Sequence, residues 1–250
     1  MIYFVGAGPG AEDLITVRGA KLLREADCVI FAGSLVNKEL LKECKKSCVL
    51  YDSSKMSLSE VCSIYENLQE KKIVRLHSGD PCLYGAIREQ MDFLENKNIL
   101  YESVPGVSSF CAAASSLNLE YTLPSISQSV IITRLEGRTE VPSKESLKNF
   151  ASIGATMVIF LSTSLAVRVQ EELIASGIPL DTPAAVVYKA SWPQEKKWIC
   201  TISSIHKTIQ ENNIKNSALI IVGNIITHNV YEKSKLYDEN FSTGFRTGKK

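Results

Sequence analysis

Glycine and proline gather near the start of the chain, where the apolar run Ile2–Val5 continues into Gly6-Ala7-Gly8-Pro9-Gly10. This pattern predicts a buried strand that ends in a tight loop. In an open α/β sheet, ligands bind beside the loops at the carboxyl ends of the strands. The spacing of Gly6, Gly8 and Ala11 also satisfies the dinucleotide fingerprint G-x-G-x-x-G/A. The loop is therefore a candidate for binding a nucleotide-like ligand.

A nicotinamide cofactor nevertheless fits this loop poorly. In a dinucleotide site the loop runs directly into a helix, whose N-terminus holds the pyrophosphate. Here Pro9 and the polar pair Glu12-Asp13 delay the helix. The fingerprint also needs an acid at the end of the second strand, whereas the strand predicted at Cys28–Phe31 runs into Ala32-Gly33. We therefore interpret the loop as a site for a different ligand.

A second candidate, Gly79-Asp80-Pro81, follows the strand predicted at Lys72–Leu76. The Asp80 carboxylate could hold ribose hydroxyls or a cationic ligand. It could also cap the helix predicted at about Tyr84–Glu95, because Asp is a favoured N-cap residue. On spacing alone, the cap is the better interpretation.

Two arginines, Arg134 and Arg138, flank Gly137 just after the strand predicted at Val130–Thr133. Guanidinium groups bind carboxylates in a bidentate way. We therefore hypothesise that they hold carboxylates of an acidic ligand. A solvated loop with an Arg–Glu pair is the simpler alternative, and the sequence alone favours it.

The sequence gives little support for a metal site or a catalytic nucleophile. The histidines His77, His206 and His228 are scattered, and His77 follows an apolar strand, as a hydrogen-bonded core histidine would. The seven cysteines include no Cys-x-x-Cys pair. They predict reduced thiols of a cytoplasmic protein and no protein-bound metal.

The net charge and the lengths of the apolar runs limit the kinds of molecule that the protein is expected to bind. The formal net charge of the 250 residues is +1, which argues against bulk electrostatic binding to nucleic acid or to an anionic membrane. No apolar run approaches the roughly 20 residues of a membrane span. We expect a small-molecule ligand, no nucleic acid, no membrane and no signal peptide.

The order of elements predicts two α/β units. Residues 1–120 alternate strand and helix, which predicts a parallel sheet covered on both faces. Residues 121–250 predict a second unit with a mixed sheet and a polar tail from about Glu232. Within that unit, Trp192-Pro193 separates two strands and favours an antiparallel pair. We expect the active site in the cleft between the units, a common place for small ligands.

Three stretches resemble motifs of the tetrapyrrole (precorrin) methylases, namely Val5–Gly10, Gly79-Asp80-Pro81-x-x-Tyr84-Gly85 and Val104–Ser109. The resemblance continues, in the order found in the family, through Thr156–Leu161, Thr182–Val187 and Ser217–Gly223. Within the family, three shorter stretches are most similar to the branch that methylates C-11 of precorrin-4 or cobalt-precorrin-4: Ala32–Asn37, Thr133–Thr139 and Lys235–Asp238.

The resemblance implies S-adenosylmethionine as methyl donor, bound between two α/β domains, in a cytoplasmic homodimer of cobalamin (corrin ring) biosynthesis. Ser108-Ser109 stands where many relatives have Thr-Ala, and Leu161 where relatives often have Met. Ala190 and Ala218 match positions that contact adenine through backbone. The cofactor-binding residues implied are Pro9, Gly79, Asp80, Leu83, Ser108, Ser109, Leu161, Ala190 and Ala218. The substrate-binding residues expected are Gly8, Ser34, Tyr84, Arg134 and Arg138.

Methyl transfer from a sulfonium is an in-line displacement that needs the two reacting atoms about 3 Å apart and aligned. It requires positioning more than an activated nucleophile, which agrees with a sequence that contains no recognisable triad. The sequence names no general base and does not show whether the substrate carries cobalt. Alternative functions are methylation of another precorrin position, of uroporphyrinogen III, of RNA or of a protein side chain. A non-catalytic corrinoid-binding protein and an NAD-dependent oxidoreductase are more distant alternatives.

Overall fold

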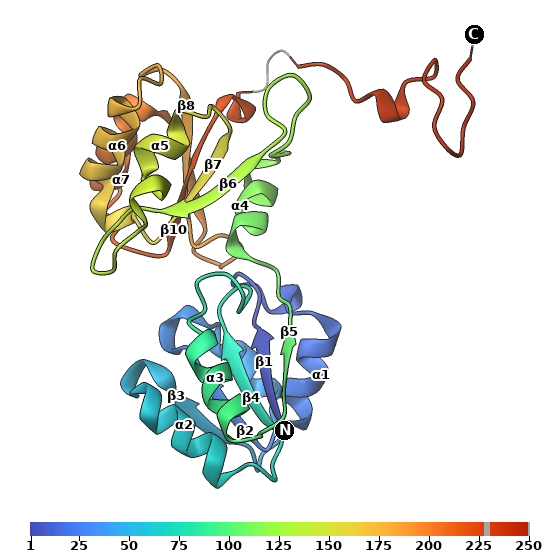
Figure 1. Cartoon of the computed structure of the whole chain (residues 1–250), viewed down its shortest axis with the longest axis vertical. Coiled ribbons are helices and arrows are strands. Elements are labelled where there is room, and N and C mark those ends of the chain that lie inside the picture. Colours follow the sequence, from blue (N-terminus) through green and yellow to red (C-terminus); the bar gives the residue numbers. More distant parts are fainter. Residues whose placement is uncertain (228–230, 250) are drawn as a thin grey trace. The chain divides into compact units, whose positions relative to one another are not determined.

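The computed structural model describes residues 1–227 and 231–249, so His228 lies outside the described residues. The chain divides into two compact units (Figure 1). Unit 1 comprises Met1–Ala113 and Lys189–Glu195, and unit 2 comprises Ala114–Tyr188 and Lys196–Lys250. A short segment from late in the sequence therefore belongs to the unit built by the first half of the chain.

Unit 1 is built on a five-stranded sheet in the order β3-β2-β4-β1-β5, and all of its strand pairs are parallel. The predicted parallel sheet is confirmed. Because β1 lies between β4 and β5, the loops that follow these three strands meet at one edge of the sheet. The strands are β1 (Ile2–Gly6), β2 (Cys28–Phe31), β3 (Val49–Asp52), β4 (Ile73–His77) and β5 (Tyr101–Val104).

Helices cover both faces of this sheet, with α1 on one side and α2 and α3 on the other (Figure 1). Alternate residues of β1 feed the two cores: Val5 packs with Leu23 of α1, and Phe4 packs with Leu94 of α3. These helices are α1 (Val17–Glu25), α2 (Leu58–Asn67) and α3 (Arg88–Asn96), with 3₁₀ helices at Glu12–Leu14, Gly33–Leu35, Lys38–Glu43 and Ser53–Lys55. A further helix, α4 (Ser109–Leu117), crosses the boundary between the two units at Ala113 and Ala114.

Two helix starts agree with what the sequence predicts, since Thr16 is a favoured N-cap residue type and Ser57-Leu58-Ser59-Glu60 matches the capping-box pattern. The Thr16 hydroxyl accepts a hydrogen bond from the Gly19 amide at 3.1 Å and begins α1. Ser57 and Glu60 form a reciprocal capping box at the start of α2. In both cases a side chain satisfies backbone N–H groups that have no partner within the helix.

Three helix predictions need correction. The helix expected from Tyr84 begins only at Arg88, because Tyr84 and Ala86 adopt φ values of 56° and 48°, outside the right-handed helical region. The sequence also predicts a helix over Lys38–Cys44, but this segment is a 3₁₀ helix, Lys38–Glu43. It predicts a further helix over about Lys144–Ala151, which is interrupted at Ser146, whose hydroxyl caps the shorter α5 (Leu147–Ala151).

Unit 2 carries a mixed five-stranded sheet in the order β6-β7-β10-β8-β9. Only β6 and β7 are parallel; the remaining pairs, including the β8–β9 hairpin, are antiparallel. The predicted mixed sheet and the predicted antiparallel pair are therefore both confirmed. The strands are β6 (Val130–Arg134), β7 (Thr156–Phe160), β8 (Pro183–Tyr188), β9 (Lys196–Thr201) and β10 (Ala218–Val222).

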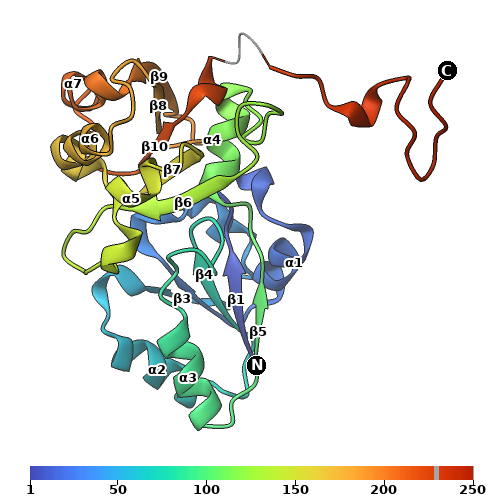
Figure 2. The same cartoon turned by 45° about the horizontal axis from the view of Figure 1, so that its top comes forward.

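One face of this sheet packs against α5, α6 and α7 (Figure 2). Its core joins Met157 and Ile159 of β7 to Leu173 of α6 and Ile209 of α7. The helices are α5 (Leu147–Ala151), α6 (Ala166–Ala175) and α7 (Ile205–Glu211), with 3₁₀ helices at Ser143–Glu145, Thr163–Leu165, Ile202–Ser204, Asn224–Ile226 and Lys235–Tyr237. Among the residues that the structure describes, no helix is long and apolar enough to cross a membrane.

Candidate functional site

Three loops follow β1, β4 and β5 at the carboxyl edge of the unit 1 sheet. The first two are joined through their backbones, since the Ala7 amide donates to the His77 carbonyl at 2.7 Å. Gly8 and Gly79 then exchange two hydrogen bonds, at 3.3 and 2.8 Å, in a short antiparallel bridge. The glycine loop at the start of the chain is thus paired with the Gly79-Asp80-Pro81 loop.

The third loop touches the other two through glycine backbone. A Cβ atom on Gly106 would lie 2.2 Å from the Gly79 carbonyl oxygen and 2.7 Å from the Gly6 Cα atom. Both neighbours are backbone atoms that no side-chain rotation can move away. Glycine is needed here because the loops approach more closely than any side chain allows.

Asp80 ties the second loop to the third. Its Oδ1 accepts a hydrogen bond from the Cys82 amide at 2.7 Å, and its Oδ2 accepts one from the Gly106 amide at 2.9 Å. The interpretation of Asp80 as a helix cap is wrong, because α3 begins at Arg88 and its N-cap residue, Ile87, makes no side-chain cap. The carboxylate instead fixes the relative position of two loops that are far apart in sequence.

The structure brings several of the predicted residues of unit 1 together around these loops. Ser108 is buried, and a Cβ atom on Gly79 would lie 3.6 Å from both the Ser108 Cα atom and the Ser109 nitrogen. Leu83 lies in the turn closed by Asp80, and Tyr84, a residue that is 43% exposed, follows it. Ser34 is exposed in the 3₁₀ helix after β2.

Residues that the sequence reasoning did not single out hold the glycine loop from outside. The Trp192 indole N–H donates to the Pro9 carbonyl at 2.8 Å, and the Asn37 side-chain amide donates to the Gly10 carbonyl at 2.9 Å. Trp192 belongs to the Lys189–Glu195 segment of unit 1, as does Ala190, which is buried. The position of Trp192 next to Pro193 in a turn could have drawn attention to it, but nothing in the sequence predicts which residues it contacts.

The delayed helix predicted after the glycine loop is confirmed. The 3₁₀ helix Glu12–Leu14 comes first, and α1 begins only at Val17. The Ala11 amide, which would face a phosphate in a dinucleotide site, donates instead to the Ser191 hydroxyl at 3.0 Å. The loop therefore lacks the helix N-terminus that a pyrophosphate requires.

In unit 2, Leu161 and Ala218 lie at the same end of the sheet, at the end of β7 and the start of β10. These strands are antiparallel neighbours, with Ile159 opposite Ile220. Leu161 has a φ of 51° and is 68% exposed, whereas Ala218 is buried and its carbonyl accepts a hydrogen bond from Thr163 at 3.2 Å. Both predicted cofactor residues of this unit thus belong to one edge.

The two predicted carboxylate-binding arginines differ in their surroundings. The Arg134 guanidinium donates to the carbonyls of Thr139 at 3.1 Å and Glu140 at 2.7 Å, so it closes its own loop. The Arg138 side chain makes no hydrogen bond or ion pair within the described part of the chain, and the residue is exposed. The expected Arg–Glu pair is replaced by a contact from Arg168 to the Glu136 carbonyl at 3.2 Å.

His77 is a core histidine, as expected, but it is not hydrogen-bonded as expected. It is 4% exposed, and its Nε2 atom has no hydrogen-bond partner among the described residues. Burial, and secondarily the charge of Arg75, lowers the pKa of His77 to about 3. The imidazole is therefore neutral at pH 7 and contributes no charge to the site.

This burial makes folding stability depend on pH. Below about pH 6.5 the unfolded chain binds a proton at His77, while the folded chain does not until about pH 3, so stability falls as the pH drops through this window. Relative to His77→Leu, the protein should lose about 2 kcal/mol more between pH ~7 and ~5. Urea unfolding at both pH values measures this difference. Equal losses in the two proteins would contradict the assignment.

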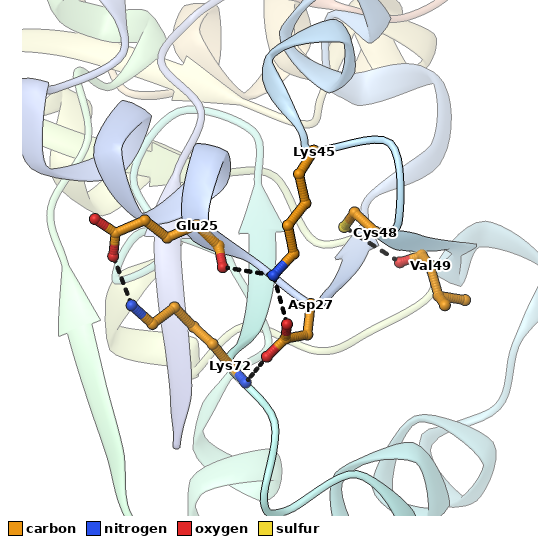
Figure 3. A network of polar contacts seen from close by, with 6 residues as sticks. All are labelled: Glu25, Asp27, Lys45, Cys48, Val49 and Lys72. Atoms are coloured by element: carbon orange, nitrogen blue, oxygen red, sulfur yellow. Dashed lines mark hydrogen bonds and ion pairs between the residues drawn. The ribbon is translucent and has the colours of Figure 1, made fainter.

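Charged side chains gather at the opposite, amino-terminal edge of the unit 1 sheet (Figure 3). Asp27 accepts hydrogen bonds from the Lys45 ammonium at 2.5 Å and the Lys72 amide at 2.8 Å, while the Lys72 ammonium pairs with Glu25 at 2.6 Å. The contact with Lys45 lowers the pKa of Asp27, and the contact with Lys72 lowers the pKa of Glu25. These pairs join strand starts and lie away from the glycine loops.

The thiols of Cys28 and Cys44 are poorly suited to act as nucleophiles. Burial raises the pKa of Cys28 and of Cys44 to about 12, so both thiols stay protonated at neutral pH. Within residues 1–227 and 231–249, no group of three or more His, Cys, Asp or Glu side chains is placed to hold a metal ion. The loops are suited to binding and orienting a ligand through backbone and shape.

Comparison with known proteins agrees with this geometry. Residues 1–206 match the family described as Tetrapyrrole (Corrin/Porphyrin) Methylases. A cobalt-precorrin-4 C(11)-methyltransferase of Methanocaldococcus jannaschii is 48% identical over 251 residues, which cover 100% of this chain and 97% of that protein. This similarity extends through both units and the tail.

Solved structures show the same fold. The X-ray structure of a cobalamin biosynthetic enzyme, cobalt precorrin-4 methyltransferase CbiF, superposes with a TM-score of 0.88 at 42% identity, covering 90% of this chain and 95% of that one. A uroporphyrin-III C-methyltransferase from Thermus thermophilus, complexed with S-adenosylhomocysteine, has a TM-score of 0.76 at 26% identity, covering 90% and 98%. With its two α/β units and its glycine-lined loops, this chain belongs to the tetrapyrrole methylases.

Proposed function

We propose that this protein transfers a methyl group from S-adenosylmethionine to C-11 of cobalt-precorrin-4, in the biosynthesis of the corrin ring. The observation that carries the proposal is the 48% identity over the whole chain to a relative named for that reaction. The cobalt-containing substrate is preferred because the solved structure at 42% identity is also named a cobalt-precorrin-4 enzyme. We further propose a cytoplasmic homodimer.

The loops of unit 1 suit a methyl donor. The Gly8–Gly79 bridge and the Asp80 contacts fix a surface of backbone beside Gly79, where a side chain would point toward Ser108 and Ser109. We propose that Pro9, Gly79, Asp80, Leu83, Ser108, Ser109 and Ala190 hold the donor in this unit, with Leu161 and Ala218 contributing from unit 2. S-adenosylmethionine supplies an electrophilic methyl group, and the protein aligns it with a substrate carbon that is already electron-rich.

This chemistry explains why the loops carry little charge. The sulfonium loses its charge during transfer, so the transition state gains most from alignment and from exclusion of water. His77 is neutral and enclosed, and Asp80 is held by two backbone amides. We propose that Gly8, Ser34 and Tyr84 contact the tetrapyrrole and that the exposed Arg138 binds one of its carboxylates, with Arg134 shaping the same loop.

The test is incubation with S-adenosylmethionine carrying a trideuterated methyl group, with cobalt-precorrin-4 and metal-free precorrin-4 in parallel. We expect mass spectrometry to show one labelled methyl in the cobalt product, and NMR after removal of the metal to place it at C-11. Label at another carbon, or labelling of uroporphyrinogen III, would indicate a different methylase of the family. A chain that binds the macrocycle without labelling it would be a carrier.

The remaining alternative, an oxidoreductase, is tested by calorimetry. We expect S-adenosylhomocysteine to bind and NADH to give no measurable heat. Binding of NADH in preference would contradict the interpretation of the glycine loop. Light scattering of the purified protein tests the homodimer independently of catalysis.

A further inference from the structure

The connection between β8 and β9 does more than reverse the chain. Both strands belong to unit 2, yet the intervening Lys189–Glu195 segment belongs to unit 1. Within it, the Ser191 amide donates to the Glu195 carboxylate at 2.6 Å and the Trp192 amide donates to the Lys189 carbonyl at 3.0 Å. Lys189 and Ser191 adopt φ values of 48° and 67°. The segment is thus an internally bonded turn with a defined shape.

This turn and Asn37 hold three consecutive residues of the glycine loop. Trp192 donates to the Pro9 carbonyl at 2.8 Å, Asn37 donates to the Gly10 carbonyl at 2.9 Å, and Ser191 accepts from the Ala11 amide at 3.0 Å. The backbone at Pro9, Gly10 and Ala11 therefore has a fixed partner at each residue. These contacts restrict the loop far more than the glycine backbone would by itself.

The indole ring also packs directly on Gly10. A Cβ atom on Gly10 would lie 2.2 Å from Cδ1 and 2.3 Å from Nε1 of Trp192. The φ of Gly10 is not in the left-handed region, so the backbone itself would accept alanine. Gly10 is therefore glycine because Trp192 occupies the space where a side chain would be.

We propose that Trp192 is a positioning residue that couples the methyl-donor contact at Ala190 to the placement of the glycine loop against the tetrapyrrole. This inference rests on the proposed function, which assigns Ala190 to the donor and Gly8 to the substrate. Ala190 is buried and lies next to Ser191 in the same turn. When the donor fixes that turn, Trp192 and Ser191 transmit the constraint to Pro9 and Ala11.

The test is a cycle of Gly10→Ala, Trp192→Ala and the double variant. Gly10→Ala places a methyl group against the indole, so we expect the KM for the tetrapyrrole to rise about tenfold, with kcat nearly unchanged. Affinity for S-adenosylhomocysteine should fall as well, because the displaced indole belongs to the same turn as Ala190. In the Trp192→Ala background, Gly10→Ala should have almost no further effect. Additive effects in the cycle would overturn the proposal.

Trp192→Phe distinguishes the effect of the hydrogen bond to Pro9 from the effect of ring packing on Gly10. Phenylalanine keeps the apolar contact with Gly10 but cannot donate to Pro9, so we expect a smaller rise in KM than for Trp192→Ala. A purely structural role would lower the melting temperature and the active fraction while leaving the KM of the folded enzyme unchanged. That outcome would also contradict the proposal.

Fluorescence supplies a measurement that does not need the tetrapyrrole. The chain contains two tryptophans, Trp192 and Trp198, so Trp198→Phe leaves Trp192 as the single reporter. We expect its emission to shift when S-adenosylhomocysteine binds and the shift to shrink in Gly10→Ala. An emission that does not respond to bound S-adenosylhomocysteine would contradict the coupling. This arm remains informative if the C-11 product does not form, so failure of the inference and failure of the proposed function can be told apart.

Discussion

Replacing Asp80 with alanine is expected to weaken S-adenosylhomocysteine binding by roughly ten- to a hundredfold. The substitution removes the acceptor of two backbone N–H groups, those of Cys82 and Gly106. Each hydrogen bond to a charged group contributes about 1.5–3 kcal/mol. Without the Asp80 carboxylate, the loop that follows β4 is no longer tied to the loop that follows β5, beside the proposed donor site. Calorimetric titration with S-adenosylhomocysteine measures the effect.

Two further variants help to explain the change in affinity for S-adenosylhomocysteine. Asp80→Asn keeps one carbonyl oxygen and turns its amide nitrogen toward the other N–H group, so an intermediate loss is expected. Asp92→Ala is the matched control, because Asp92 lies on α3 with a 56% exposed side chain paired to Arg88. Such surface pairs contribute little, and donor affinity should not change. Undiminished affinity in Asp80→Ala would exclude Asp80 from the binding site.

Gly106→Ala should disrupt the same region by a different route. The added Cβ atom would meet the Gly79 carbonyl oxygen at 2.2 Å, so the loop must move and give up its hydrogen bond to Asp80. Overpacking of this kind costs about 1–3 kcal/mol of folding stability. We expect methyl transfer to fall about a hundredfold, because small displacements at a reacting centre have large effects.

Urea unfolding and initial rates of methyl transfer measure these two consequences. Gly244→Ala is the control, since no heavy atom of the described residues outside its immediate chain neighbours lies within 4 Å of the added Cβ atom. It should leave both stability and rate unchanged. Wild-type rates in a folded Gly106→Ala protein would show that the close approach of the loops is not needed for catalysis.

The sequence predicted the sheets because apolar runs such as Val29–Phe31 and Thr156–Phe160 form strands wherever they can be buried on both faces. It predicted the caps at Thr16 and Ser57 because capping is a contact between neighbours in sequence. The same local chemistry explains the delayed helix after Pro9, and that delay alone argues against a nicotinamide site. Contacts between near neighbours are therefore the part of the fold that residue types predict well.

The errors arose where a distant contact decides the local outcome. The sequence places Asp80 just before a helix and so favours a cap, but one of its partners is Gly106, 26 residues away. Tyr84 and Ala86 have a left-handed backbone conformation, which the residue types Tyr and Ala do not predict. Trp192 lies 183 residues from Pro9 in sequence, so only the folded chain reveals their hydrogen bond.

The late position of the Lys189–Glu195 segment has a consequence for synthesis on the ribosome. The five strands of unit 1 are complete at Val104, but the partners of Pro9 and Ala11 emerge only with Ser191 and Trp192. Domains generally fold from the N-terminus as the chain is made. The nascent sheet therefore forms with its first loop held by the Gly79 loop and by Asn37. The contacts of Pro9 and Ala11 with the late segment form only after most of unit 2 has been translated.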